Sequence, residues 1–121
     1  MKKLLIIALC VFGITACEKQ AQETKLDDNK VYFFYQSTCP HCHHALEHIN
    51  HVAPNLDMQM VEIAGSGRNL FIKCVQKFNL PREQIGTPLI CMGDHYIMGW
   101  SEIEAVKFDE YVKSFMMTVI D

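Results

Sequence analysis

The chain has 121 residues, a formal net charge of −3 and a hydrophobic content of 50%. This length allows one small domain with a single core, and no internal repeat suggests a second unit. Two of the 11 basic residues are Lys2 and Lys3 and the other nine are scattered along the chain, so no basic cluster is present to attract nucleic acid or an anionic lipid surface.

The first 16 residues have the pattern of a bacterial export signal. A basic start at residues 1–3 precedes an apolar run at 4–16, which is too short to span a bilayer. Residues 14–17, with the sequence Ile-Thr-Ala-Cys, resemble a bacterial lipobox, in which the cysteine becomes the lipidated first residue of the mature chain. The alternative is an ordinary secretory signal that is cleaved nearby.

A lipid on Cys17 implies a periplasmic protein that is anchored to a membrane. Glu18 follows in place of Asp, and by resemblance to enterobacterial lipoproteins this favours the outer membrane. Losing the two lysines of the signal changes the net charge from −3 to −5. Residues 17–29 are polar and lack apolar periodicity, which predicts a tether, and residues 30–121 remain for the domain.

A C-x-x-C motif separates the first predicted strand, residues 30–36, from the first predicted helix, residues 42–52. The strand is rich in aromatic residues and has no clean alternation, which is typical of a strand covered on both faces. Pro54 lies just past the end of the helix. The apolar side chains expected to point inward from this helix are those of Ala45, Leu46, Ile49 and Val52.

The motif itself, Cys39-Pro40-His41-Cys42, is typical of a redox dithiol or of half of a metal site, with a structural disulfide as a third alternative. No second C-x-x-C is present, which favours the dithiol. Cys39 falls at the helix start, where unpaired N–H groups and the helix dipole stabilise a thiolate. Pro40 suits the first turn, and His41 can donate a hydrogen bond or carry a positive charge near the sulfurs. Cys42, one turn into the helix, is expected to be buried and to act as the resolving thiol.

The elements that follow complete the order β-α-β-α-β-β-α. They are a strand at 56–63, a turn with a helix N-cap at 65–67, a helix at 69–78, strands at 89–92 and 95–98 around a Gly93-Asp94 turn, and a last helix opened by a capping box at 101–104. The first three elements form a βαβ unit, which requires a parallel strand pair. We expect inward-facing residues at Leu70, Cys74 and Phe78 in the second helix and at Ile103, Phe108, Val112, Phe115 and Val119 in the last.

This order, with the C-x-x-C at the first helix, resembles the thioredoxin-like superfamily at the size of a glutaredoxin. The resemblance covers roughly residues 30 to 115 and implies an α/β fold with a mixed four-stranded sheet flanked by helices. Its Cys-Pro-His-Cys motif is similar to the active site of DsbA-type disulfide oxidases. Gly86-Thr87-Pro88 is similar to the family's cis-proline loop, which faces the dithiol. The resemblance implies a cis Thr87–Pro88 bond and a substrate-binding role for Thr87 and Pro88.

The sequence departs from these families at three points. Phe33 stands where thioredoxins and DsbA-type enzymes carry a buried acid, so no carboxylate at that position can accept a proton from the resolving thiol. Residues 99–102 lack the glutaredoxin pattern that holds glutathione. The chain also has no room for the large helical insertion of DsbA-type enzymes, which argues against a broad peptide groove.

Four histidines, His41, His44, His48 and His51, are spaced 3, 4 and 3 along the first helix and form one stripe beside its buried face. His44 and His48 at i, i+4 could hold Zn²⁺, Cu²⁺ or Ni²⁺, whereas the alternative is a polar helix flank. The sequence therefore leaves a second hypothesis open, a metal-binding or metal-delivery module that uses the C-x-x-C thiols and this stripe.

Two further cysteines, Cys74 and Cys91, fall on the second helix and the third strand. With Cys17 lipidated, four thiols remain, an even number in an oxidising compartment. They form either a second disulfide or two buried free thiols, and both alternatives stay open at this point.

The leading hypothesis is a lipid-anchored periplasmic thiol–disulfide oxidoreductase without a cofactor. In this hypothesis Cys39 attacks or is attacked, Cys42 resolves the mixed disulfide and His41 tunes the potential. The expected partners are protein or small thiol and disulfide substrates, a redox partner that resets the dithiol, and the membrane through the lipid anchor, but no nucleic acid.

Overall fold

A computed structural model describes residues 25–120, and for Ile120 it describes the backbone only. The predicted signal peptide, the lipidation site Cys17 and the first part of the predicted tether lie outside the described residues. No helix among the described residues has both the length and the apolar character needed to cross a membrane.

Four strands form one mixed sheet in the order β2-β1-β3-β4. The inner strands are β1 (Val31–Tyr35) and β3 (Leu89–Met92), and the outer ones are β2 (Met58–Glu62) and β4 (His95–Met98). β1 runs parallel to β2 and antiparallel to β3, which confirms the predicted βαβ unit. The β3–β4 hairpin has the predicted bounds, and its turn uses Gly93 at a φ of +59°, in the left-handed region that favours glycine.

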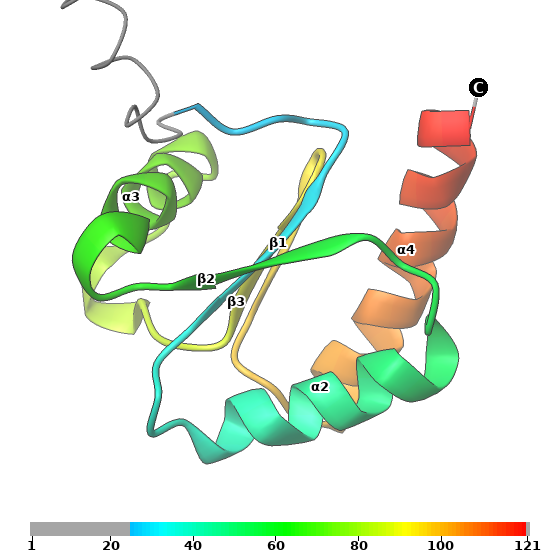
Figure 1. The fold of residues 1–121 in the computed structure, drawn as a ribbon, viewed down its shortest axis with the longest axis horizontal. Coiled ribbons are helices and arrows are strands. Elements are labelled where there is room, and N and C mark those ends of the chain that lie inside the picture. The colour runs from blue at the N-terminus through cyan, green and yellow to red at the C-terminus, as the bar shows by residue number, and fades with distance from the viewer. Residues whose placement is uncertain (1–24, 121) are drawn as a thin grey trace, which may run out of the picture.

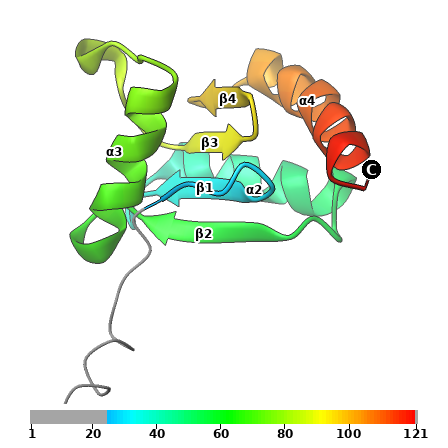
Figure 2. The ribbon, with the colours of Figure 1, turned by 90° about the horizontal axis from the view of Figure 1, so that it is seen from above.

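Within residues 25–120, three helices cover the two faces of this sheet. Figures 1 and 2 show α2 (Pro40–Val52) and α4 (Glu102–Ile120) on one face and α3 (Arg68–Lys77) on the other. Short 3₁₀ turns at Gly65–Gly67 and Arg82–Gln84 flank α3. This arrangement confirms the predicted α/β class and the mixed four-stranded sheet flanked by helices.

The sheet separates two apolar cores, and alternate residues of β1 enter each of them. Val31 and Phe33 pack against α2 and α4, whereas Tyr32 and Phe34 pack against α3. All four side chains are at most 1% exposed. The missing alternation in the sequence is therefore explained, because both faces of this inner strand are covered by helices.

The helices differ from their predicted form mainly at their ends. α2 begins at Pro40, two residues before the predicted start, because Cys39 occupies the N-cap. Three residues expected to point inward are exposed instead, namely Val52 (42%), Ile103 (66%) and Val119 (42%). Val52 and Val119 lie in the last turns of their helices, whereas Ile103 lies off the buried face of α4 that Phe108, Val112 and Phe115 define.

The starts of α3 and α4 are built differently. Ser101 accepts a hydrogen bond from the backbone N–H of Ile103 at 3.2 Å, and its hydroxyl donates to the carboxylate of Glu104, as expected for a capped start of α4. α3 has no side-chain cap, and Gly67 stands at its N-cap. A Cβ atom at Gly67 would collide with the backbone carbonyl of Glu62, so this turn requires glycine.

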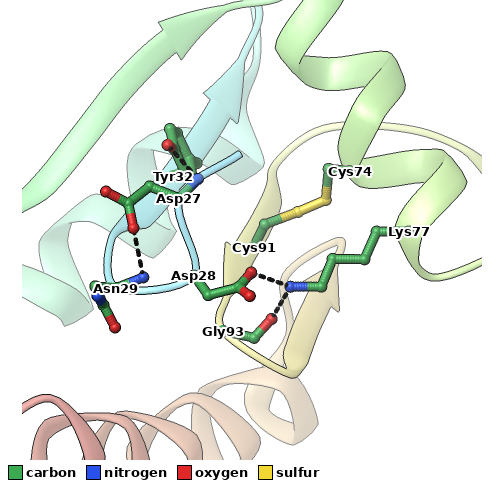
Figure 3. Close-up of polar contacts among 8 residues, drawn as sticks. All are labelled: Asp27, Asp28, Asn29, Tyr32, Cys74, Lys77, Cys91 and Gly93. Atoms are coloured by element: carbon green, nitrogen blue, oxygen red, sulfur yellow. Dashed lines mark hydrogen bonds and ion pairs between the residues drawn. A yellow bond between two sulfur atoms is a disulfide. The ribbon is translucent and has the colours of Figure 1, made fainter. Parts of the chain in front are cut away.

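The described end of the predicted tether packs onto the domain. The Lys77 ammonium at the end of α3 lies 2.8 Å from the Asp28 carboxylate and also donates to the carbonyl of Gly93 (Figure 3). The backbone N–H of Asp27 donates to the Tyr32 hydroxyl at 2.9 Å. These contacts fasten residues 25–30 to the domain at the end of the molecule that carries the hairpin turn.

Candidate active site

Cys39 caps the N-terminus of α2 with its sulfur. The residue has extended backbone angles (φ −127°, ψ 99°), and its Sγ accepts a hydrogen bond from the backbone N–H of Cys42 at 3.1 Å. Pro40 occupies the first helical position, where its missing N–H has no intrahelical partner to lose. The sulfur therefore lies at the positive end of the helix dipole with a backbone donor pointing at it, which favours a thiolate at Cys39.

The two sulfurs of the motif are bonded to each other and differ in accessibility. The Cα atoms of Cys39 and Cys42 lie 5.3 Å apart, within the normal range for a disulfide. Cys42 is 5% exposed, whereas Cys39 is only partly buried. An incoming thiolate can therefore reach the Cys39 sulfur more readily, and Cys42 lies on the inner side of the pair as expected for a resolving thiol.

The Thr87–Pro88 loop lies against this disulfide. The Thr87–Pro88 peptide bond is cis, as predicted, and Pro88 is buried. The Thr87 hydroxyl lies 3.4 Å from the Cys39 sulfur and 3.4 Å from the side-chain oxygen of Gln36. The backbone N–H of Gly99 donates to the Pro88 carbonyl at 2.8 Å, which fixes the loop to the bend that follows β4. The loop before β3 and the loop between β1 and α2 thus bring Thr87 and Cys39 together, although the two residues are 48 positions apart in the sequence.

Gln36 is a member of this site that the sequence analysis did not single out. It follows β1 directly and lies three residues before Cys39. This position, at the start of the loop that leads to Cys39, is the one sequence feature that could have indicated its place in the site. Its side-chain amide gives the site a polar group beside the Thr87 hydroxyl.

The surroundings of Cys42 are apolar. Its side chain belongs to the same core cluster as Phe33, Ala45 and Phe108, and Trp100 packs against that cluster. Within residues 25–120, no polar or charged side chain is buried. The position that thioredoxins fill with an acid is therefore occupied by the buried ring of Phe33, and no buried carboxylate is present in the described core to exchange a proton with Cys42.

No protein-family model matches the sequence, and no curated protein matches it. Among solved structures, the chain is similar to a glutaredoxin from Archaeoglobus fulgidus, with a TM-score of 0.52 and 25% identity over 69% of this chain and 86% of that one. A buckwheat glutaredoxin in complex with glutathione gives a TM-score of 0.47 and 15% identity over 74% of this chain and 76% of that one.

The fold is thioredoxin-like. The archaeal neighbour and the bonded C-x-x-C pair at the start of α2 make the chain a thiol–disulfide oxidoreductase of the thioredoxin/glutaredoxin type. The site has the parts that this chemistry requires, an accessible sulfur at a helix N-terminus and a second sulfur that can displace it.

The histidine stripe of this thioredoxin-like domain is divided among separate contacts. Nδ1 of His44 lies 3.9 Å from the carboxylate of Glu47, and Nε2 of His48 lies 2.9 Å from Oδ1 of Asp109. His41 and His51 are exposed on the surface of α2. Within the part of the chain that the structure describes, no three side chains of His, Cys, Asp or Glu come close enough to hold a metal ion, so the structure does not support the metal-module hypothesis.

The second cysteine pair lies on the opposite face of the sheet. The structure bonds the sulfurs of Cys74 on α3 and Cys91 on β3, with their Cα atoms 6.4 Å apart (Figure 3). Cys74 is fully buried and Cys91 is 4% exposed, both in the core beneath α3. Because Cys42 lies in the other core, this pair is separated from the redox site by the sheet and serves as a link between α3 and β3.

Proposed function

We propose that this chain is a lipid-anchored periplasmic oxidoreductase that donates its Cys39–Cys42 disulfide to the thiols of protein or small-molecule substrates. The export signal and the lipobox-like residues 14–17 support the location, and Glu18 favours the outer membrane. The even number of thiols left after lipidation of Cys17 fits an oxidising compartment.

The observation that carries the direction is the N-cap position of Cys39. The backbone N–H of Cys42 points at its sulfur from 3.1 Å, and the helix dipole adds to the same effect. Both interactions favour the thiolate, which exists only after reduction. Stabilising the reduced form makes the disulfide a stronger oxidant, and a stabilised thiolate is also a better leaving group. We therefore propose oxidation of substrates as the direction.

The proposed reaction proceeds by two thiol–disulfide exchanges. A substrate thiolate attacks the accessible sulfur of Cys39, the Cys39–Cys42 bond breaks, and Cys42 leaves as a thiolate that takes up a proton. The second substrate thiolate then attacks the substrate sulfur of the mixed disulfide, and Cys39 leaves as a thiolate. The substrate loses two electrons, which the cysteine pair gains. A disulfide of a redox partner takes these electrons in a later exchange and resets the pair.

Two neighbouring groups are proposed to assist. The Thr87–Pro88 loop receives the substrate backbone next to the disulfide, and the Thr87 hydroxyl donates to the Cys39 sulfur, 3.4 Å away. His41 is exposed between the two cysteines of the motif and contributes positive charge or a hydrogen bond when a thiolate forms.

The reduction potential of the Cys39/Cys42 pair, measured in equilibrium with glutathione, tests the direction. We expect a value near the DsbA value of about −120 mV, and a value near the thioredoxin value of about −270 mV would reverse the direction. Replacement of Cys39 by Ser should abolish exchange while the circular dichroism spectrum stays unchanged. A Cys39→Ser variant with normal activity would contradict the assignment of Cys39 as the attacked sulfur.

The location is tested separately. Mass spectrometry of the mature N-terminus should find lipid on Cys17, and Cys17→Ser should move the protein out of the membrane fraction. Glu18→Asp should shift the anchored protein from the outer to the inner membrane. An unmodified Cys17, or cleavage at another residue, would contradict the anchor and leave the redox chemistry untouched.

A further inference from the structure

The outer face of α4 exposes three large apolar side chains. Ile103, Val106 and Met117 are 66%, 59% and 69% exposed. The buried face of the same helix is defined by Phe108, Val112 and Phe115, so α4 is apolar on two sides. Packing in the core explains why Phe108, Val112 and Phe115 are apolar. It does not explain the apolar character of the three exposed residues.

These outer residues follow a heptad pattern with two charges at its centre. Positions 103, 106, 110, 113 and 117 are spaced 3, 4, 3 and 4, which places them on one narrow stripe of the helix. Glu110 and Lys113 are exposed, and neither makes an ion pair with another residue between 25 and 120. The stripe therefore consists of an apolar end, an acid, a base and a second apolar end.

This stripe is complementary to itself when two copies run in opposite directions. A two-fold axis that crosses α4 midway between Glu110 and Lys113 places Glu110 of one copy opposite Lys113 of the other, and does so twice by symmetry. The same axis places Val106 opposite Met117, also twice. A parallel pair would instead place Glu110 against Glu110 and Lys113 against Lys113, which is repulsive.

We propose that the outer stripe of α4, defined by Ile103, Val106, Glu110, Lys113 and Met117, binds a second copy of this chain in an antiparallel helix pair. Charge complementarity selects this partner and this orientation. A single pair of 19-residue helices, each roughly 28 Å long, buries less area than a standard protein interface. We therefore expect a weak dimer that forms where the protein concentration is high.

The redox site stays accessible in this dimer. Figures 1 and 2 show α4 along one side of the domain, with its C-terminus at the end opposite the start of α2. The disulfide lies at that start, and the five stripe residues are exposed on the side of α4 away from the core that contains Cys42. The proposal is also independent of the direction of the redox reaction and of the lipid anchor.

Charge reversal tests the pairing. The dimer dissociation constant of the full protein, purified as the cell makes it, is measured by analytical ultracentrifugation. Glu110→Lys and Lys113→Glu each introduce two like-charge contacts per dimer and should weaken it roughly tenfold or more. The double variant exchanges the two charges and should restore dimerisation to within about threefold of wild type. Lys73→Glu makes the same charge change as Lys113→Glu at an exposed position of α3. It serves as the matched control and should not change the dimer dissociation constant.

Zero-length cross-linking provides a second readout. A carbodiimide should join the Glu110 carboxylate of one copy to the Lys113 amine of another, and a mixture of ¹⁵N-labelled and unlabelled protein distinguishes this product from a bond within one chain. A monomer at all accessible concentrations would overturn the proposal. A dimer whose dissociation constant does not change with the charge reversals would also overturn it. The same holds if the stripe binds neutral lipid vesicles and the protein does not dimerise.

Discussion

Nε2 of His48 lies 2.9 Å from Oδ1 of Asp109, and this contact joins α2 to α4 at the rim of the core that also contains Cys42. The His48 ring also lies beside Trp100, with 5.5 Å between ring centroids, and edge-on to Phe108. The side chains of His48 and Asp109 are 28% and 44% exposed. The helix that carries the dithiol is thus positioned by a polar contact that water still reaches.

We expect this contact to add little to global stability. Because an exposed pair is screened by water, His48→Gln and Asp109→Asn should each lower the free energy of unfolding by about 1 kcal/mol or less. Urea denaturation of both single variants and the double variant gives the coupling between them. Asp57→Asn, at an exposed aspartate of the α2–β2 loop, is the control and should have almost no effect. Strictly additive losses in the double variant would show that the two side chains do not interact.

The hydroxyl of Thr87 should stabilise the Cys39 thiolate. Thr87→Val keeps the shape of the side chain but removes the donor that lies 3.4 Å from the sulfur. The thiolate should then form at a higher pH, with the midpoint raised by about 0.5 to 1 pH unit, the size expected for one lost hydrogen bond. The ultraviolet absorbance of the thiolate, measured across pH, follows the titration. Thr118→Val, which removes a hydroxyl near the C-terminus of α4, should leave the midpoint unchanged.

The role of His41 can be measured in the same titration. We expect the thiolate midpoint of Cys39 in the wild type to lie clearly below the ordinary thiol value of about 8.5, because the helix N-terminus favours the charged form. His41→Ser should raise this midpoint and lower the reduction potential, since it removes a positive or hydrogen-bonding group near the sulfur. His43→Ser, at the next exposed histidine of α2, provides a comparison outside the C-x-x-C. A midpoint near 8.5 in the wild type that stays the same in His41→Ser would remove the electrostatic basis of the oxidase proposal.

The Cys74–Cys91 bond should stabilise the fold without changing the redox site. It closes a chain segment of 17 residues, and such a bond stabilises a protein by roughly 3 kcal/mol through its effect on the unfolded chain. A Cys39→Ser/Cys42→Ser background isolates this second pair. Replacing Cys74 and Cys91 by Ala in that background should lower the free energy of unfolding by about 2 to 4 kcal/mol.

Mass spectrometry of the same background protein checks that the bond exists. Alkylation before and after reduction should label Cys74 and Cys91 only in the reduced and unfolded sample. Labelling of both residues in the unfolded but unreduced protein would show that they are free thiols.

The sequence predicts local features well where they have a local cause. The β3–β4 hairpin has the bounds that the sequence predicts, because Gly93-Asp94 is a strong turn signal between two apolar runs. The position of Cys39 at the helix start follows from Pro40 in the same way.

Contacts between distant residues that neither a local pattern nor the family resemblance marks could not be predicted from the sequence. Gln36 contacts Thr87 across 51 residues, and His48 contacts Asp109 across 61 residues, with no local pattern to mark either pair. The sequence also does not predict the exposure of Ile103, because α4 has apolar residues on two sides and periodicity alone does not say which side faces the sheet.

The contacts of Lys77 with Asp28 and Gly93 bear on how the domain withstands mechanical load. A pull on the chain ahead of Lys25 reaches the Asp27–Tyr32 hydrogen bond and then these contacts before it reaches β1. β1 is an inner strand with hydrogen-bonded neighbours on both sides, so force along it must shear two rows of hydrogen bonds together. The Cys74–Cys91 bond joins α3, which carries Lys77, to the neighbouring strand β3. Tension on the N-terminal side is therefore shared between β1, α3 and β3 before it reaches α2 with its pair of sulfurs.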